Sequence, residues 1–344
     1  MLSRLPVAFV FRAIFAIVGL FCPSFADPSC DSTRGSQILQ AQALAFDERF
    51  LSADSIYRQI ISDNPDDPAG YLFRAGVLFA EMSDAEDNLN ESLFKRLLDT
   101  VDVLSDRILD TCGANTAAWM HLWRGHARTY RALWESKFGS SLKALRLGLS
   151  TIDEYGAGLK RDSTVIDLYA GIGSYHYWKS AKAGVLRWLG IFRNEKDKGI
   201  VELRRAADSS LLHRDLSRSS LIWVLLDGQE YDSAIALAED FTQRYPEGKT
   251  FLWPIAQAQF RQAHYPQAVE TFVRIRTRLE ASPGNYHNLI ECDYHLVQCY
   301  TWLEETRLLE TTKQNYLSYR ERIPAPTKTR QSDKINFLNR VVNR

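Results

Sequence analysis

Two stretches of equal length decide the fold: DGQEYDSAIALAEDFTQRYP at residues 227–246 and RQAHYPQAVETFVRIRTRLE at residues 261–280. Each begins with a polar turn and continues as a helix with one apolar face. The apolar positions recur 34 residues later, with Ala234, Ala238 and Phe241 matched by Ala268, Phe272 and Ile275. A hairpin of this size cannot cover its apolar face alone, so neighbours must stack on both sides.

A second apolar segment precedes each copy, so that each repeat is a pair of helices. The small residues at 234, 256 and 268 allow the paired helices to approach closely. The pattern Gly228-x2-Tyr231-x2-Ala234 followed by Pro246 resembles the tetratricopeptide repeat, and the period of 34 between the two copies is that of this repeat. That resemblance implies an all-α fold, a right-handed α-α superhelix, and no particular activity.

The repeat pattern extends well beyond its clearest part at residues 215–280. A third copy stands far upstream, where the matching positions are Ala53, Tyr57, Ile60 and Pro65. We therefore expect a tetratricopeptide-like solenoid over residues 27–326, built from six or seven hairpins. Residues 327–344 are basic and form a C-terminal tail, in which 333–342 is expected to be a capping helix.

Residues 1–26 have the features of a secretory signal peptide. Arg4 and Arg12 supply positive charge, and residues 13–21 form an apolar run that is short for a membrane span. Ser24 and Ala26 place small residues before a cleavage site at Asp27. The sequence predicts export to the periplasm or cell envelope, with an uncleaved membrane anchor as the alternative. The mature chain then has no spanning helix, and other membrane association stays open.

The charge balance argues against nucleic acid as a partner. The chain carries 42 basic and 42 acidic residues, and its composition, 24% charged and 45% hydrophobic, is that of a globular protein. Binding to nucleic acid requires a strongly basic face. Oligomeric state and partner identity are not indicated by the sequence.

Four cysteines follow the signal peptide. Cys30 and Cys112 are the candidates for a disulfide in an oxidising compartment, and the alternative is free, buried thiols. Cys292, His295 and Cys299 share one helical face in a spacing like that of metal ligands. The Cα atoms of the two cysteines are about 10.5 Å apart on a straight helix, too far for both thiolates to reach one zinc ion. We expect no metal and no other cofactor.

Aromatic residues form one helical stripe between residues 117 and 138. Its members are Trp119, Trp123, Tyr130, Trp134 and Phe138. Rings at this spacing favour core between stacked hairpins, and the alternative is an aromatic groove for a peptide or lipid chain.

Small residues at 170, 171, 173 and 174 form a flat strip on a later helix. Each glycine lowers helix propensity by about 1 kcal/mol, so a close contact with another helix is expected to compensate, with a ligand groove as the alternative. Residues 168–207 faintly resemble the tetratricopeptide family associated with the mitochondrial outer membrane and inclusion bodies. That similarity implies only a helical scaffold.

Two further segments carry local predictions. Residues 81–88 are acidic but lack the alternating ligands and central glycine of a calcium loop, so a solvated loop is expected. Residues 156–158, Gly-Ala-Gly, are expected to break a helix.

The sequence favours an exported scaffold that binds proteins and is not an enzyme. It contains no Gly-x-Ser-x-Gly elbow, and its histidines are scattered. Exposed aromatic and arginine side chains would anchor the partner. The candidate anchors are Trp123, Arg128, Tyr175, Tyr177 and Trp178. The alternative function is a carrier of lipid or another apolar ligand, with the same aromatic residues lining its groove.

Overall fold

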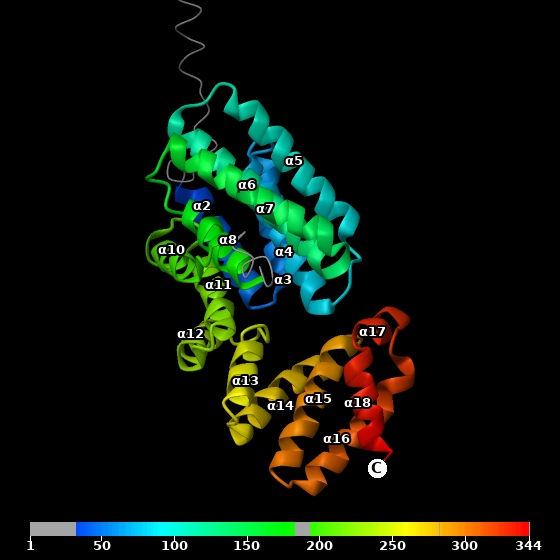
Figure 1. Ribbon diagram of the computed structural model, residues 1–344. Helices are drawn as coiled ribbons and strands as arrows, with labels where there is room; N and C mark the ends of the chain where they lie inside the picture. Colours follow the sequence, from blue (N-terminus) through cyan, green and yellow to red (C-terminus); the bar gives the residue numbers. More distant parts are fainter. Residues whose placement is uncertain (1–31, 183–192, 282, 344) are drawn as a thin grey trace, which may run out of the picture.

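The computed structural model describes residues 32–343 except for residues 183–192 and 282 (Figure 1). The described residues form α-helices and one short 3-10 helix, η2 (Arg320–Arg322), and no strand is found among them. The α-helices are α2 (Ser32–Phe46), α3 (Phe50–Asp63), α4 (Pro68–Ala85), α5 (Glu91–Leu109), α6 (Ala114–Phe138), α7 (Ser141–Arg161), α8 (Leu168–Lys182), α10 (Lys196–Ser209), α11 (Arg214–Asp227), α12 (Tyr231–Arg244), α13 (Leu252–Arg261), α14 (Tyr265–Ala281), α15 (Tyr286–Trp302), α16 (Thr306–Tyr319), α17 (Ala325–Arg330) and α18 (Ser332–Val342).

Consecutive helices pack as hairpins, and each hairpin packs on the next. Contacts run without interruption from α2 to α8 and from α10 to α16, and α8 packs on α10. The short helix α18 then packs on α15 and α16. The chain is therefore an all-α solenoid of stacked helix pairs, the architecture expected from the repeats.

The repeat positions form the core that the sequence predicts. All six apolar repeat positions are fully buried, namely Ala234, Ala238, Phe241, Ala268, Phe272 and Ile275. In the upstream copy, Ala53, Tyr57 and Ile60 are buried as well. Small side chains at 234 and 268 bring the paired helices together, and the larger ones fill the space between hairpins.

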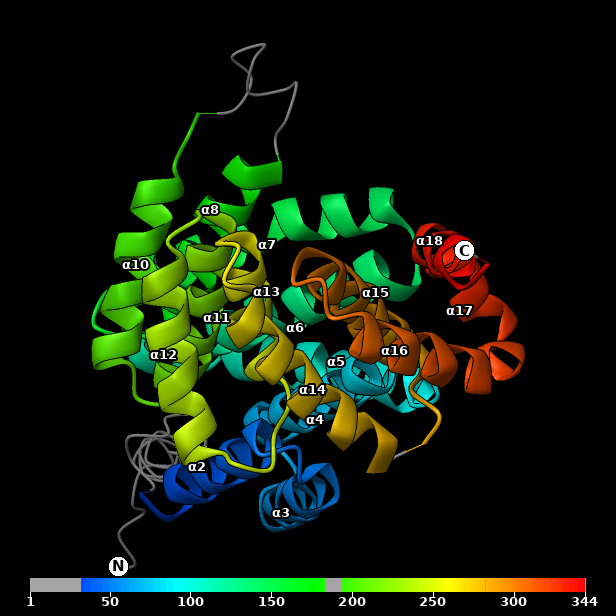
Figure 2. The ribbon, with the colours of Figure 1, turned by 90° about the horizontal axis from the view of Figure 1, so that it is seen from below.

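The solenoid curves far enough that its first hairpin touches its later ones (Figures 1 and 2). The ring of Phe46, at the end of α2, packs against Phe241, Tyr245 and Phe251, with centroids 5.5, 5.4 and 5.8 Å away. A Cβ on Gly248 would lie 2.5 Å from the carbonyl oxygen of Phe46, so only glycine fits this approach. Residues about two hundred positions apart thus share one apolar cluster.

The glycine strip on α8 makes the close helix contact that was predicted. A Cβ on Gly173 would lie 2.7 Å from the backbone nitrogen of Leu203 and 2.8 Å from the carbonyl oxygen of Gly199. A Cβ on Gly171 would enter the ring of Tyr155. These glycines let α8 lie directly against α10 and α7.

Two local predictions are wrong. Helix α7 continues through residues 156–158 to Arg161, because Gly158 packs beneath Leu168 and against the backbone of Ala118. Helix α4 continues to Ala85, so the acidic segment at 81–88 is not a free loop. Asp84 and Glu86 contact the C-terminal half of the chain instead.

The structure describes the C-terminal end of the chain but not the predicted signal peptide. A helix is found at residues 332–342, where one was expected, and its capping role stays a prediction. The signal peptide lies outside the described residues, as does Cys30, so export and the disulfide to Cys112 also stay predictions. Within the described part of the chain, no helix combines the length and the hydropathy needed to cross a membrane.

Candidate functional site

The two halves of the chain meet through a set of polar contacts, called here the closing contact. It joins residues 47–48 and 84–86 of the N-terminal half to residues 247–250, 285–288 and 330 of the C-terminal half. Lys249 Nζ lies 2.7 Å from a carboxylate oxygen of Glu48 and 2.7 Å from one of Asp84. The backbone N–H groups of Lys249 and Thr250 donate to Glu48, each at 2.7 Å.

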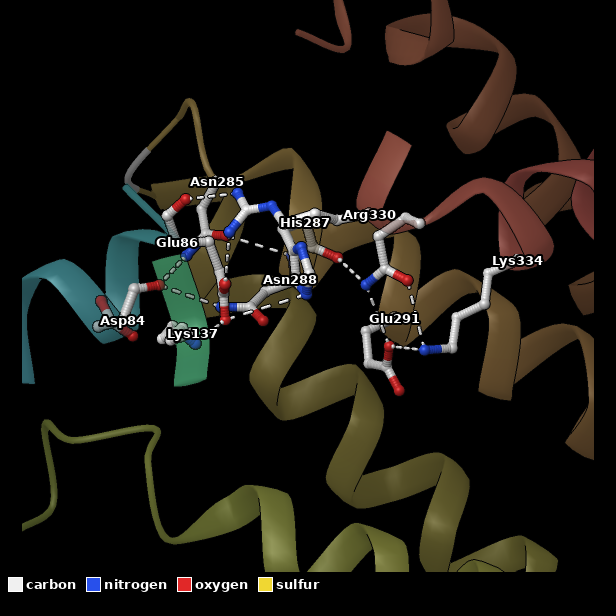
Figure 3. Close-up of polar contacts among 10 residues, drawn as sticks. Asp84, Glu86, Lys137, Asn285, His287, Asn288, Glu291, Arg330 and Lys334 are labelled. Atoms are coloured by element: carbon white, nitrogen blue, oxygen red, sulfur yellow. Dashed lines mark hydrogen bonds and ion pairs between the residues drawn. The ribbon is translucent and has the colours of Figure 1, made fainter. Parts of the chain in front are cut away.

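Glu86 is the second centre of the closing contact (Figure 3). The Glu86 carboxylate forms ion pairs with Lys137 at 2.6 Å and with Arg330 at 3.4 Å. Arg330 also donates a hydrogen bond to the Glu86 carbonyl at 2.7 Å. His287 stands 3.9 Å from the same carboxylate. Burial, reinforced by the nearby arginine and lysine, lowers the pKa of His287 despite the pull of Glu86.

Burial also marks the Asp84 side of the closing contact. Asn285 and Asn288 both donate to the Asp84 carbonyl, the latter at 3.1 Å. Burial, with the neighbouring Glu48, raises the pKa of Asp84 in spite of Lys249. Burial disfavours the charged form of Lys249, but Glu48 and Asp84 outweigh it and raise the pKa of the lysine. These groups hold the two halves of the chain together.

An open groove lies beside the closing contact, along α13, α15, α17 and α18. It consists of two adjoining pockets of about 330 and about 220 Å³ that share Tyr294 and Lys334. The larger pocket is lined by Tyr294, Arg330, Gln331, Asp333, Lys334, Phe337 and Arg340. The smaller is lined by Gln257, Phe260, Arg261, Glu291, Tyr294, His295 and Lys334.

Aromatic rings form an unbroken row of contacts, called here the aromatic row, whose first four members line this groove and whose last two continue beyond its lining. From one end to the other its members are Phe337, Tyr294, His295, Phe260, Tyr265 and Trp302. Successive ring centroids are 5.1, 5.1, 4.8, 5.8 and 5.9 Å apart. The row ends at Trp302, which is stacked on Tyr265 and 70% exposed.

Charge at the middle of the groove is organised around Glu291. Lys334 Nζ lies 2.5 Å from one carboxylate oxygen, and His295 Nε2 lies 3.3 Å from the other. Burial opposes ionisation of Glu291, but the hydrogen bonds from His295 and Lys334 outweigh it and lower its pKa to about 2. Lys334 also lies over the ring of Tyr294, with 5.7 Å from its nitrogen to the centroid. The groove therefore keeps this carboxylate charged and internally paired.

Of the anchors proposed from the sequence, Trp123 and Arg128 lie on α6. Trp123 is fully buried, between the rings of Trp119, Phe73 and His213. Arg128 is tied down by the Glu154 carboxylate at 2.6 Å and the Ser150 carbonyl at 3.1 Å. A partner that binds the folded chain does not reach Trp123, which instead belongs to the core expected for the aromatic stripe.

The other three anchors lie on α8. Tyr177 is buried, with its hydroxyl 3.0 Å from the Val224 carbonyl and 2.8 Å from the Asp227 carboxylate. Burial and the nearby carboxylate raise the pKa of Tyr177. Tyr175 and Trp178 are half-buried, and each has a lysine over its ring. The structure therefore brings the α8 residues together but leaves only Tyr175 and Trp178 accessible.

Beneath Trp123 lies the most enclosed polar cluster of the N-terminal half. The ring of His213 stacks on that of His126 at 4.6 Å, and His213 Nδ1 lies 2.9 Å from the Asp167 carboxylate. Asp167, 2% exposed, also accepts backbone N–H groups from Leu211, Leu212 and His213. Burial acts to raise the pKa of Asp167, but its hydrogen bonds with His213 and the backbone hold it below the usual value. This cluster links α6 to the residues that directly precede α8 and α11.

Packing keeps the three candidate metal ligands, Cys292, His295 and Cys299, in separate surroundings. Cys292 and Cys299 are fully buried, and burial raises the pKa of the Cys292 thiol and brings that of Cys299 to about 12. His295 stacks on Phe272 with centroids 4.8 Å apart. Across the described residues, no three His, Cys, Asp or Glu side chains lie close enough together to hold a metal ion.

The groove was not identified from the sequence. Its lining comes from residues as far apart in the chain as Gln257 and Arg340, so no local motif contains it.

Comparison with known proteins adds little beyond the architecture. No protein-family model and no curated protein matches the chain. Among solved structures, it is similar to the crystal structure of the C-terminal part of a TPR repeat-containing protein from Cytophaga hutchinsonii. The two are 17% identical with a TM-score of 0.43, over 86% of this chain and 98% of that chain. At such a TM-score the likeness carries no argument, and the proposals below rest on the groove.

Proposed function

We propose that this chain is an exported, non-catalytic scaffold of the tetratricopeptide type that binds a protein segment in the groove. The observation that carries the proposal is the groove itself, with half-buried aromatic rings in its lining and an aromatic row that continues from it to the exposed Trp302. Tryptophan, tyrosine and arginine are the residues that most often dominate binding energy at protein interfaces. Tyrosine and arginine line this groove, and Trp302 ends the aromatic row.

The lipid-carrier alternative draws no support from the same pockets. Both are open, and charged side chains stand beside their aromatic rings. A site for an apolar chain is expected to be enclosed and lined mostly by apolar residues. A groove of mixed polarity suits a peptide, whose backbone and side chains offer both kinds of contact.

Photocrosslinking tests the groove as the binding site. A benzoylphenylalanine placed at Phe337 is expected to form an adduct with one protein in cells that export the chain. The same probe at Leu51, which is 83% exposed on α3, serves as the control and should not form that adduct. Replacing Tyr294 with alanine should abolish the adduct at 337. Identical adducts at both positions, or none at 337, would reject the proposal.

Export is proposed from the sequence of residues 1–26 and has its own test. Fractionation followed by N-terminal sequencing should find the chain outside the cytoplasm and beginning at Asp27. A chain recovered with Met1 in the membrane fraction would support the uncleaved anchor, and one recovered from the cytoplasm would reject export.

A further inference from the structure

The basic side chains of the groove differ in whether they are paired with a carboxylate. Four basic side chains line it, against the carboxylates of Glu291 and Asp333. Arg330 is held by Glu86, and Lys334 by Glu291. Arg340 makes no ion pair with any described carboxylate, and Arg261 donates a 3.4 Å hydrogen bond to the Leu226 carbonyl. Each of these two arginines belongs to only one of the pockets, with the shared residues between them.

From this arrangement we infer that the groove selects an acidic, extended peptide segment that also carries aromatic or leucine side chains. The inference rests on the proposed function and names the chemistry of its partner. Arg261 and Arg340 would receive carboxylates at separate places along the groove, and the aromatic row would receive apolar side chains between them. Arginine suits this role because its planar guanidinium binds carboxylate through two parallel hydrogen bonds.

The ionisation of Glu291 makes this selection sharper. Its charge is already paired with Lys334, and His295 lies within hydrogen-bonding distance of it, so it does not cancel the two arginines. Asp333 is exposed in the first turn of α18, where the helix N-terminus favours a negative charge. The positive charge that is left to attract a partner therefore lies at Arg261 and Arg340.

Other anions fit the groove less well. Nucleic acid would require a continuous basic face, whereas here two carboxylates interrupt the cations and the whole chain is balanced in charge. An anionic lipid surface would meet only exposed groups, but Tyr294, His295 and Phe337 are recessed and half-buried. A peptide reaches both the recessed rings and the exposed guanidinium groups.

Selection from a library of random displayed peptides on the purified full chain tests the inference. Peptides enriched on the wild-type chain should be acidic and should contain aromatic or leucine residues. Binding of the enriched peptides, measured by fluorescence anisotropy, should weaken about tenfold for each of R261E and R340E and about a hundredfold for both together. It should also weaken as salt is raised.

The matched control is the double variant R96E/R204E. Both arginines are exposed on other helices and form no ion pair with a described carboxylate, and their replacement changes the net charge by the same amount. This variant should bind the enriched peptides like the wild type. All variants should keep the wild-type melting temperature within a few degrees, because exposed substitutions rarely perturb stability.

The possible failures are distinguishable. Enrichment of neutral or basic peptides that crosslink from position 337 would overturn the acidic partner and leave the scaffold standing. If no peptide is enriched and position 337 yields no protein adduct, the proposed function fails and the inference fails with it. Tighter binding of phosphatidylserine vesicles or single-stranded RNA, lost in R261E/R340E, would assign the groove to those ligands and reject a peptide.

Discussion

Two aromatic regions of this chain have similar composition and opposite surroundings. Around Trp123, the rings of Trp119, Tyr155 and Phe73 are buried between helices, a region called here the Trp123 core. Along the aromatic row, Tyr294, Phe337 and Trp302 remain partly open to solvent. The difference lies in the neighbours, because Gly125 and Gly171 make room for the ring of Tyr155. Aromatic content alone therefore does not identify a binding surface.

The largest expected effect comes from the Trp123 core. Replacing Trp123 with alanine removes a fully buried ring and should lower the free energy of unfolding by about 3–5 kcal/mol. Denaturant unfolding followed by circular dichroism measures it. Trp123→Phe is the control and should lose much less, because the buried indole nitrogen has no hydrogen-bond partner to forfeit. A loss below about 1 kcal/mol for alanine would show that this ring is not core.

The groove should instead depend on charge, through Glu291. Its pKa in the folded chain, about 2, is below the ordinary value of 4.5, so its contribution is present above pH 4.5 and is lost as the pH falls toward 2. The Glu291→Gln variant should be less stable than wild type at pH 7, by on the order of 3 kcal/mol. Urea unfolding at several pH values should show the unfolding free energies of the wild type and of Glu291→Gln converging near pH 2. A constant difference between them over this range would contradict the lowered pKa of Glu291.

Close helix contact in the N-terminal half should tolerate no added methyl group. Gly173→Ala puts a Cβ against the backbone of α10, which cannot move away as a side chain can, and should destabilise the chain by about 2 kcal/mol. Gly156→Ala is the matched control on α7. Nothing lies within 4 Å of its added Cβ, so it should stabilise by roughly 0.5–1 kcal/mol. Thermal melts compare the two, and equal shifts would remove the packing argument.

The smallest stability effect should come from Trp302. Because its ring is 70% exposed, Trp302→Ala should change the free energy of unfolding by less than about 0.5 kcal/mol. The same variant should weaken binding of the peptides enriched on the groove, since an exposed tryptophan in a binding face often contributes strongly to affinity. A variant that melts much earlier than wild type would place Trp302 in the core, as Trp123 is.

The sequence was sufficient for the architecture because the repeat is local. Ala234 and Phe241 have the same buried helical environment as Ala268 and Ile275 in the next copy, so spacing alone predicts the hairpins and their buried face. It also predicted the contact at Gly173, because a glycine within a helix is costly unless another helix lies close.

What spacing could not supply is the curvature of the solenoid. The contacts of Asp84 with Lys249 and of Glu86 with Arg330 join residues 165 and 244 positions apart. Such pairs depend on small rotations summed over many hairpins, and no local pattern records that sum. For the same reason the sequence did not reveal the groove. Arg261 and Arg340 lie on one surface only because α18 packs back onto α15.

Hydrogen–deuterium exchange of the full chain, with and without a peptide enriched on the groove, tests the central claim most directly. The account predicts that the peptide slows exchange in α13, α15 and α18 and leaves α6 and α8 unchanged. Slowed exchange in α6 and α8 with no change in α13, α15 and α18 would contradict it, because binding would then involve the region around Trp123 and Tyr177 and not the groove.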